Sequence, residues 1–471
     1  MEKELYLYNT MGKRKELFTS IEENKVKMYS CGPTVYSAPH IGNMRAYVFS
    51  DILKRILISL GYEVKHIINI TDVGHLVSDA DEGEDKLEKA SKQNGRSVFE
   101  IANHFTKAFK KDVENLSIIP PQKYTFATDY IKEQIEIIKV LEQKGYTYIV
   151  SDGVYFDISK YGDYTKLANL DLKGSSEVTR VGFNEEKKNK ADFALWKFSP
   201  KNEKRQMEWK SPWGIGFPGW HIECSAMVKA NLGDHIDIHT GGVDHIPVHH
   251  TNEKAQSECA NDKKFVNYWL HINFLNTKEK MSKSKGNIIT VEDVFMNGYD
   301  YNTLRFFYLL SHYRSEVIFL YDTMEKVRNR YRKLLNKALE VGAYQSKEYF
   351  VDENIEKINV PLLDDLNTPK ALSVFGELVF DKALDNNAKA NLFNFINSLL
   401  GLKFIEYSNK EVPVDIRDLV LKRAGEKRSK NFEEADRIRD NIIERGFYIK
   451  DKKGSVVVYA DGYADYVLET N

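Results

Sequence analysis

One loop, residues 31–43, constrains the fold of this chain more than any other segment. An alternating segment at residues 25–28 precedes it and an amphipathic segment at residues 44–60 follows it, which predicts a strand, a loop and a helix in that order. Pro33 and Pro39 exclude regular structure from the loop. The start of the following helix favours phosphate, because it offers unpaired N–H groups and the positive end of the helix dipole. The loop is therefore a candidate nucleotide site, although an ordinary strand-to-helix loop also carries glycine and proline.

A second segment far along the chain strengthens the nucleotide hypothesis. Residues 280–284 read Lys-Met-Ser-Lys-Ser, and Lys280 and Lys283 give the segment the character of a cationic loop suited to polyphosphate. A solvated basic turn is the alternative. The pair formed by this segment and residues 40–43 resembles the HIGH and KMSKS motifs of class I aminoacyl-tRNA synthetases. Asn43 replaces the last histidine of the first motif and can still donate a hydrogen bond to phosphate.

The composition bounds the class of protein. A chain of 471 residues can bury several cores, and its net charge of −1 means that any nucleic-acid contact must use local patches. No apolar run approaches the ~20 residues needed to cross a membrane, and the first residues do not read as a signal peptide. The three cysteines, Cys31, Cys224 and Cys259, do not make a disulfide framework. We expect a cytoplasmic chain whose thiols are available for metal. A monomer is also expected, although the composition does not indicate it.

The pattern of apolar runs predicts an α/β, Rossmann-like domain with an insertion, followed by an α-helical C-terminal region. The resemblance to class I synthetases implies that the first part is catalytic and that the C-terminal region binds tRNA. Residues 66–70 form an apolar run that ends at Thr71, as expected of a buried parallel strand. A second strand, residues 234–239, ends in a loop with Gly241 for close approach and Asp244 to accept ribose hydroxyls. The predicted divisions are 1–120 with 211–290 for the catalytic domain, 121–210 for the insertion, 291–320 for a helical junction, 321–405 for a helical bundle on the tRNA side, and 406–471 for a small anticodon-recognition region.

Two segments near the C-terminal end are locally basic. Residues 321–341 carry six Lys/Arg against three Asp/Glu, and residues 422–453 carry eleven against seven. Solvated helices are the simpler interpretation of such segments. Patches that contact an RNA backbone are the alternative, because phosphate binding depends on local positive charge.

Four residues form a candidate metal site. His249 and Glu253 are four apart on a helix predicted for residues 249–258, so they project from one face. With Cys31 and Cys224 they make a plausible tetrahedral zinc set. His250 is expected to point away from His249, and it could be a ligand only in place of that residue. Cys259 falls on another face of the helix and is predicted to be a small buried apolar residue.

Three segments extend the resemblance to the cysteinyl-tRNA synthetase family: residues 31–36, 219–227 and 249–253. The resemblance covers residues 5 to 455 approximately. It implies activation of L-cysteine by ATP with Mg²⁺, and transfer of the cysteinyl group to the 3′ terminal ribose of tRNA(Cys). The implied roles are one Zn²⁺ held by Cys31, Cys224, His249 and Glu253; cysteine binding by Gly32, Thr71, Trp220 and His239; ATP binding by His40, Asn43, Gly241, Asp244 and Lys283; and catalysis by His40, Asn43, Lys280 and Lys283.

Two other functions fit part of the same pattern. A ligase that joins activated cysteine to an amino-sugar would share the chemistry, but it has no use for the long basic region beyond residue 321. A catalytically silent tRNA- or zinc-binding paralogue has no use for an intact 280–284 segment and four candidate ligands. The final stretch, residues 459–471, does not resemble the usual end of the family.

Overall fold

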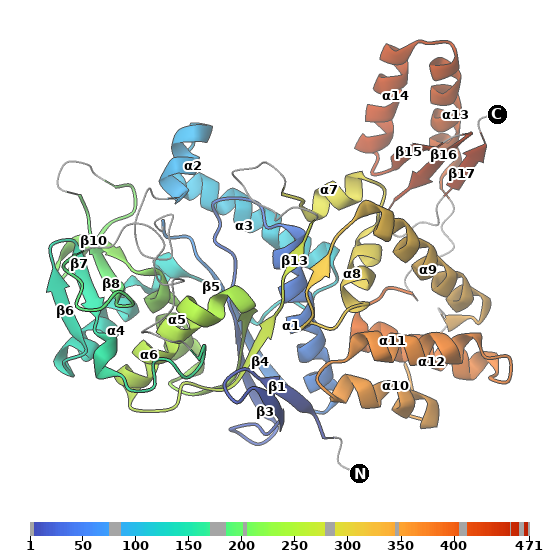
Figure 1. The fold of residues 1–471 in the computed structure, drawn as a ribbon. Helices are drawn as coiled ribbons and strands as arrows, with labels where there is room; N and C mark the ends of the chain where they lie inside the picture. Colours follow the sequence, from blue (N-terminus) through green and yellow to red (C-terminus); the bar gives the residue numbers. More distant parts are fainter. Residues whose placement is uncertain are drawn as a thin grey trace.

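The computed structural model describes residues 4–74, 86–169, 185–200, 205–277, 288–343, 348–404, 412–452, 454–460 and 466–469. A parallel five-stranded sheet lies at its centre (Figure 1), with the order β12-β11-β3-β4-β5. The chain runs from β3 outward through β4 and β5, and from β11 outward to β12. The crevice at the carboxyl ends of β3 and β11 is thus the place where such sheets bind ligands. The strands are β3 Lys25–Ser30, β4 Glu63–Ile70, β5 Lys123–Phe126, β11 Ile236–Gly242 and β12 Val266–Ile272.

Helices cover the central sheet and connect its strands. The helix α1, Ile41–Ser59, begins earlier than the 44–60 predicted from the sequence, because His40 caps it with its side chain and draws the end of the loop into the first turn. A second capping box, made by Ser97 and Glu100, starts α3. The chain between these strands also forms α2 Lys86–Asn94, which packs on α3 Val98–Asn115, and α5 Trp220–Leu232, which packs on β4 and on α6 Thr251–Asn261.

The insertion is an antiparallel sheet with the order β6-β7-β8-β10-β9, at the left of Figure 1. Both of its predicted limits, residues 121 and 210, are wrong. The strand β5 pairs with β4 in the central sheet, and β10 lies beyond residue 210 yet pairs with β8. Strands of three to five residues carry too little periodicity to assign to a sheet. The elements are α4 Ile131–Gln143, β6 Thr147–Val150, β7 Gly153–Phe156, β8 Phe193–Phe198, β9 Trp209–Ser211 and β10 Gly214–Pro218.

The core of the central domain continues into the helical bundle that follows it. One cluster of buried apolar residues joins α1 and β3 to the helices beyond residue 321. A short parallel pair, β13 Leu275–Asn276 with β14 Val317–Ile318, connects the two regions. Near the start of the chain, β1 Tyr6–Asn9 and β2 Arg14–Leu17 form an antiparallel hairpin. The helices are α7 Val291–Met296, α8 Tyr301–Leu309, α9 Tyr321–Glu340, α10 Glu353–Leu363, α11 Thr368–Phe380 and α12 Asn386–Leu400.

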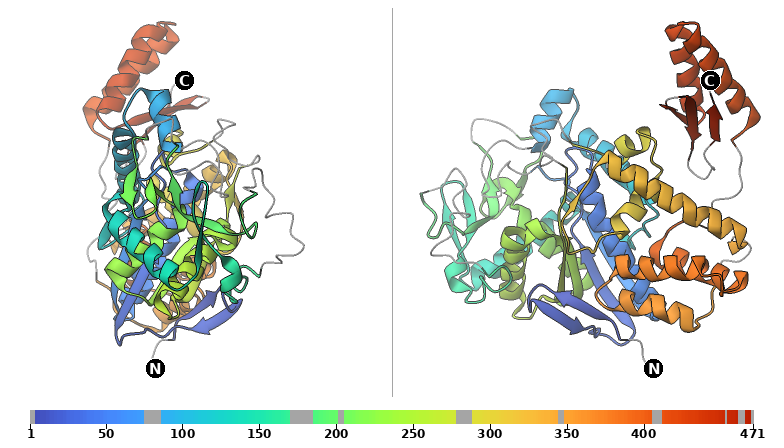
Figure 2. Two further views of the ribbon diagram at one scale, coloured as in Figure 1. Left: turned by 90° about the vertical axis from the view of Figure 1, so that its left-hand side faces the viewer. Right: turned by 45° about the vertical axis from the view of Figure 1, so that its right-hand side comes forward.

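The last part of the described chain forms a unit with a core of its own. The helices α13 Val414–Arg428 and α14 Phe432–Glu444 pack on an antiparallel sheet of β15 Tyr448–Lys452, β16 Ser455–Tyr459 and β17 Tyr466–Glu469. This unit stands above the helical bundle (Figure 2). Helices were predicted here from the sequence, and the sheet was not.

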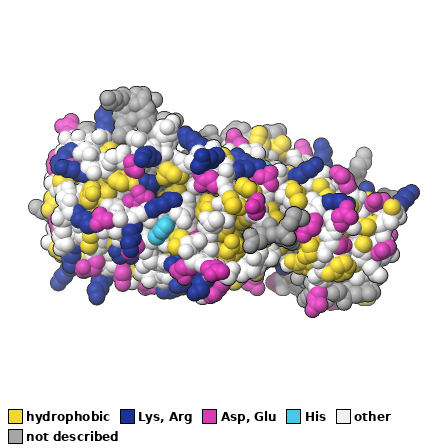
Figure 3. All heavy atoms as spheres, turned by 90° about the horizontal axis from the view of Figure 1, so that it is seen from below, with side chains coloured by type: hydrophobic (Ala, Val, Ile, Leu, Met, Phe, Trp, Pro, Cys, Tyr) yellow, Lys and Arg dark blue, Asp and Glu magenta, His cyan; other side chains and the backbone are white. Residues whose placement is uncertain are grey.

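One face of the molecule agrees with the near-neutral composition. The face shown in Figure 3 intermixes Lys and Arg with Asp and Glu along its length. In the part of the chain that the structure describes, no helix is long and apolar enough to cross a membrane.

A buried ion pair holds the bundle to the central domain. Arg305 of α8 is fully buried; it pairs with Asp51 of α1 and donates to the carbonyl oxygens of Leu116 and Leu400, each at 2.7 Å. Burial alone would raise the pKa of Asp51, but Arg305 and Arg55 outweigh burial and lower it. Asp51 is therefore a buried anion that depends on its two arginine partners.

We expect Asp51→Asn to lower the free energy of unfolding by about 3–5 kcal/mol, because it leaves the charge of Arg305 buried without its partner. Urea denaturation followed by circular dichroism measures this loss. Asp163→Asn is the matched control: Asp163 pairs with Lys166 on the surface, and an exposed pair contributes at most about 1 kcal/mol. A loss at Asp51 no larger than that at Asp163 would contradict the structural role of the buried pair.

Candidate active site

A pocket of about 390 Å³ opens at the carboxyl ends of β3 and β11. Its walls are the loop after β3, the first turn of α1, the start of α5 and the turn after β12. Eight residues singled out from the sequence line it. They are Cys31, Gly32, His40, Asn43, Thr71, Trp220, Gly241 and Asp244.

His40 and Asn43 form a reciprocal cap at the start of α1. The backbone N–H of Asn43 donates to His40 Nδ1 at 3.1 Å, and the backbone N–H of His40 donates to Asn43 Oδ1 at 3.1 Å. Because Nδ1 accepts this bond, the ring proton of a neutral His40 resides on Nε2. The side-chain oxygen of Asn43 likewise accepts a hydrogen bond within the cap, so the NH₂ group of Asn43 is the part that can donate to a ligand. Both side chains can therefore present N–H groups to an anion at this helix terminus.

Gly42, between these two residues, allows the helix to approach the opposite wall. A Cβ at this position would lie 3.2 Å from the carbonyl oxygen of Leu275 and 2.9 Å from His40 Nδ1. A larger residue would push the first turn of α1 away from the wall. The narrow gap between α1 and the turn after β12 thus favours glycine at position 42.

The two chain segments that flank residues 278–287 both lie at the pocket. Leu275 and Asn276 line it on one side of that gap. On the other side, the carbonyl oxygen of Ile289 accepts from the N–H of Ile41 at 2.9 Å, and Thr290 pairs with His40. Lys280 and Lys283 themselves lie outside the described residues, so their roles stay predictions.

The residues predicted to bind cysteine divide into two groups. Gly32, Thr71 and Trp220 line the pocket. Gly32 has no room for a side chain, because a Cβ would lie 1.5 Å from the carbonyl oxygen of Asn69. His239 is fully buried and does not line the pocket; its Nε2 lies 3.0 Å from Glu253 Oε2. The structure thus places His239 behind the predicted metal ligands.

The four predicted metal ligands come together beneath the pocket. The ligand atoms of Cys31, Cys224, His249 and Glu253 all lie within 4.8 Å of one another. His249 Nε2 is 2.9 Å from Glu253 Oε1 and 3.6 Å from Cys224 Sγ, and Cys31 Sγ is 3.8 Å from Glu253 Oε1. Cys31 belongs to both the cluster and the pocket wall, so it connects the two.

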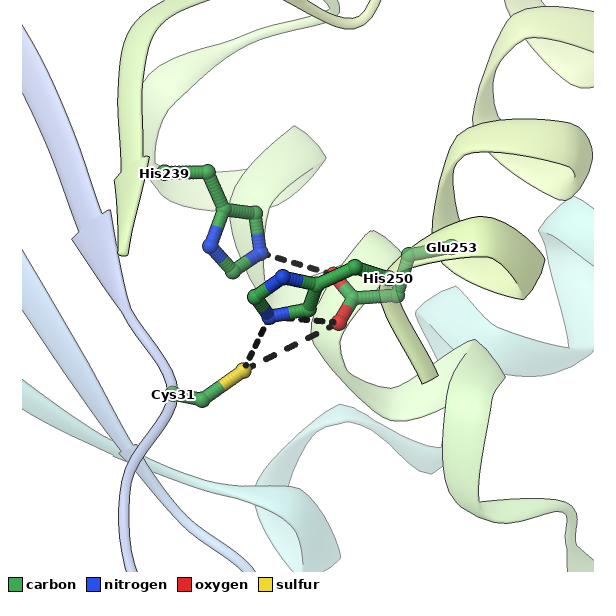
Figure 4. A group of neighbouring side chains, drawn as sticks. All are labelled: Cys31, His239, His250 and Glu253. Carbon is green, nitrogen blue, oxygen red and sulfur yellow. Dashed lines mark hydrogen bonds and ion pairs between the residues drawn. The ribbon is translucent and has the colours of Figure 1, made fainter. Parts of the chain in front are cut away.

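A second group shares two of these residues and is drawn in Figure 4. Cys31, His239, His250 and Glu253 also have ligand atoms within 4.8 Å of one another. His250 Nε2 lies 3.2 Å from Cys31 Sγ and 4.0 Å from Glu253 Oε1. His239 was not predicted to be a ligand, because its place in a strand has no spacing relation to the other residues.

The expectation that His250 points away from His249 is wrong, because both rings approach Glu253 Oε1. The expectation that it could be a ligand only in place of His249 agrees with the structure, where the two histidines belong to different candidate groups. Residues Ile246–His250 form a π-helical turn rather than the start of a regular α-helix, and α6 begins only at Thr251. The wider turn changes the angle between successive side chains, so His249 and His250 both reach the cluster. Pro247 at the start of this turn is the one sequence signal of irregular geometry.

The electrostatics of the cluster favour a cation. Burial lowers the pKa of His249, but Glu253 and Cys224 outweigh it and raise the pKa to about 10. Burial opposes ionisation of Glu253 as well, yet His239 and His249 hold its pKa well below the usual range. Burial raises the pKa of Cys31. Burial also opposes ionisation of Cys224, but hydrogen bonds with Cys31 and His249 outweigh it and lower the pKa of that thiol. The cluster therefore holds buried negative charge that His249 partly neutralises.

Aromatic and histidine neighbours fix the orientation of His249. Trp220 stacks on its ring with centroids 4.1 Å apart, and His221 Nδ1 lies 3.0 Å from His249 Nδ1. With Nδ1 engaged by His221, the Nε2 atom faces the cluster. Trp220 was singled out from the sequence, but the orienting role of His221 was not predicted.

Solved structures with this fold are class I synthetases. A LeuRS–tRNA–LeuAMS ternary complex from Agrobacterium radiobacter K84 has a TM-score of 0.59 at 11% identity, covering 82% of this chain and 84% of that one. Methionyl-tRNA synthetase of Mycobacterium tuberculosis, bound by methionyl-adenylate, has a TM-score of 0.56 at 14% identity, covering 81% and 93%. The predicted Rossmann-like fold with an insertion is thereby confirmed.

The sequence gives the same result independently. The profile of the family described as "tRNA synthetases class I (C) catalytic domain" matches residues 17–329, so the class is that of class I tRNA synthetases. The cysteine–tRNA ligase of Treponema denticola is 43% identical, over 96% of this chain and 98% of its own length. Cysteine–tRNA ligase 1 of Burkholderia lata is also 43% identical, over 95% of each chain. The chain belongs to the cysteine–tRNA ligase family.

Proposed function

We propose that this protein activates L-cysteine with ATP to form cysteinyl adenylate, and then transfers the cysteinyl group to the 3′ terminal ribose of tRNA(Cys). The observation that carries this proposal is the position of Cys31. Its thiol belongs to the buried cluster of thiol, imidazole and carboxylate groups. The same residue lines the pocket, as His40 and Asn43 do. A site for a soft ligand thus adjoins a site for phosphate.

Adenylation needs little covalent participation from protein groups. The carboxylate of cysteine attacks the α-phosphorus of ATP, and pyrophosphate leaves. The chain must align the two substrates and stabilise the charge that develops on the phosphate oxygens. His40 Nε2–H and the NH₂ of Asn43 supply donors on one side, where the positive end of the α1 dipole also favours an anion, while Asp244 and Gly241 receive the ribose. Lys280 and Lys283 are proposed to supply positive charge from the other side, with ATP entering as its Mg²⁺ complex.

The residues beneath the pocket fit one zinc ion. Bond lengths of about 2.0–2.3 Å place the ligand atoms of a tetrahedral zinc roughly 3.3–3.8 Å apart, and the separations within the Cys31, Cys224, His249 and Glu253 set lie near that range. We prefer this set over the one with His239 and His250, because two thiols suit zinc better than one. When bound, zinc supplies a soft Lewis acid that distinguishes the thiol of cysteine from the hydroxyl of serine.

The rest of the cysteine site is proposed to be made by the pocket wall around the cluster. Trp220 and Thr71 enclose the side chain of the substrate, and the backbone of Gly32 lies beside it. His239 acts from behind by holding Glu253. A site that selects by chemistry in one step needs no separate hydrolytic domain.

The C-terminal unit, residues 412–469, is proposed to contact the anticodon side of tRNA, and the bundle of residues 321–404 to contact the stem. Basic side chains on α13 and α14 support this assignment, among them Lys422, Arg437 and Arg439. We further propose a monomer that acts in the cytoplasm.

A chain that ends at Phe404 is expected to keep cysteine-dependent pyrophosphate exchange within a few-fold of the full protein but to charge tRNA poorly. The removed unit has its own core, whereas a cut near residue 320 would open the core that the bundle shares with α1. The measurements are pyrophosphate exchange, charging, and tRNA affinity at several salt concentrations, since lost phosphate contacts reduce the salt slope. Equal tRNA affinity in both proteins would rule out this role of the unit.

The overall proposal is tested by three measurements on the full protein: metal content, pyrophosphate exchange with each amino acid, and charging of purified tRNA. We expect about one zinc per chain, exchange that depends on cysteine, and cysteinylation of tRNA(Cys). Exchange without charging would indicate a cysteine-activating ligase for another acceptor. Binding of tRNA with no exchange would indicate a catalytically silent protein.

A further inference from the structure

Arg45, in the second turn of α1, is buried in an unusual environment. The side chain has no exposed surface, and no carboxylate pairs with it among the residues that the structure describes. Its guanidinium instead donates to four backbone carbonyl oxygens. Burial lowers its pKa to about 10, so the side chain remains a cation at neutral pH. A buried cation without an anionic partner is costly, and such a cost is usual where a group has a specific task.

The four carbonyl groups belong to two neighbouring turns, of which only the one with Asn273 and Phe274 lines the pocket. Nη1 donates to Asn273 O at 2.6 Å and to Phe274 O at 3.3 Å. Nη2 donates to His312 O and Ser315 O, each at 2.9 Å. The planar fork of arginine can join two turns in this way, whereas a lysine ammonium cannot span both with a fixed geometry.

One of these turns is a wall of the pocket. Residues 272–276 all line the pocket, opposite the first turn of α1 that carries His40. The other turn is held from its far side, since Asp365 accepts from Arg314 Nε at 2.8 Å and from Tyr313 OH. Arg45 thus ties the pocket wall to a turn that is itself fixed, and it does so from the helix that presents His40.

We propose that Arg45 is a positioning residue for ATP: it fixes the backbone of residues 272–276 at the spacing from α1 that the nucleotide requires. The proposal rests on the proposed function, because it assumes that ATP occupies this pocket. Arg45 touches no substrate, and it acts through the carbonyl groups of Asn273 and Phe274. Loss of the fork should therefore affect ATP and leave the cysteine side of the pocket unchanged.

The test compares Arg45→Lys and Arg45→Met with Arg328→Met in the full protein. Arg328 is the matched control, because it is equally buried and donates to the Gly298 carbonyl oxygen at 3.1 Å away from the pocket. We expect the KM for ATP to rise about 10–100-fold in both Arg45 variants, as a displacement near 1 Å does elsewhere, while the KM for cysteine changes less than about threefold. Arg328→Met should lower the melting temperature and leave both KM values unchanged.

Two further readouts separate positioning from a general loss of stability. Hydrogen–deuterium exchange of residues 271–277 should be faster in Arg45→Lys than in the parent protein, even when the two melt at the same temperature. Adding guanidinium at millimolar concentration should partly restore the KM for ATP in Arg45→Ala. An unchanged KM for ATP in Arg45→Lys, or equal rises for ATP and cysteine, would overturn the proposal. Failure of the proposed function is a different result, since the parent protein would then lack cysteine-dependent exchange.

Discussion

Replacing His249 by alanine, or Cys224 by serine, is expected to weaken cysteine binding by about 100-fold or more and to change ATP binding little. Substitutions of groups that only orient metal ligands commonly cost 10–100-fold, so the loss of a ligand should cost at least about as much. The bound zinc should fall well below one per chain. The measurements are metal analysis, and the KM values for cysteine and ATP in pyrophosphate exchange.

Two controls make this prediction specific. Cys259→Ser changes a buried cysteine that lies outside both candidate ligand groups, and it should leave zinc content and cysteine binding unchanged. His250→Ala distinguishes the two ligand sets, because His250 belongs only to the set with His239. A greater loss of zinc in His250→Ala than in His249→Ala would show that we have assigned the wrong set.

A purely structural metal is also distinguishable. In a cobalt-loaded protein, cysteine should change the absorption spectrum and serine should not, because only the thiol is a strong ligand. If the protein is folded and loaded with cobalt but its spectrum does not change when cysteine is added, the metal only joins β3, α5 and α6. The cysteine pocket would then lie elsewhere.

Replacing His40 by asparagine should reduce the turnover of adenylation by about 10²–10³-fold without loss of stability. Asparagine is a good N-cap, so it can accept the N–H of residue 43 as His40 Nδ1 does. It removes the Nε2–H donor of His40, a residue that lines the pocket. Loss of one donor to a developing charge commonly costs 10²–10³-fold in turnover. Pyrophosphate exchange and thermal unfolding measure the two effects separately.

Ser97→Ala is the companion to this experiment. Ser97 makes the same kind of capping box at the start of α3, with Glu100 as its partner, and it does not line the pocket. Its loss should cost about 1 kcal/mol of stability and leave turnover unchanged. If His40→Asn retained full turnover, His40 would be a helix cap and nothing more.

Much of the site could be predicted because it depends on local chain signals. The loop of residues 31–43 lies between a strand and a helix, and the residues after parallel strands meet at one edge of the sheet. Cys31, Thr71 and Gly241 could therefore be placed near one another from their positions after apolar runs. His249 and Glu253, four residues apart, still lie on one face although the π-helical turn joins α6 between them. Their ligand atoms are 2.9 Å apart.

The remainder depends on contacts between segments far apart in the sequence. His239 reaches Glu253 only because β11 and α6 pack together, and His250 reaches Cys31 only because of the π-helical turn. Arg45 reads in the sequence as an ordinary helix surface residue, since its partners are backbone carbonyl groups that no side-chain pattern reveals. The predicted limits of the insertion were wrong for the same reason. Hydrogen bonding between strands decides which sheet a short strand joins, and such pairing is not visible in the sequence.

The order of strands in the central sheet has a consequence for how the chain is made. On a ribosome, β3, β4 and β5 emerge early, but β11, which pairs with the other edge of β3, follows only after the whole insertion. The nascent chain therefore carries an apolar strand with an open edge. Cys31 follows this strand, and the other predicted ligands, Cys224, His249 and Glu253, are synthesised only later. Open edges of this kind are where chains aggregate before they fold. Synthesis of this protein should depend on protection of that edge during translation, and metal can be loaded only after α6 has emerged.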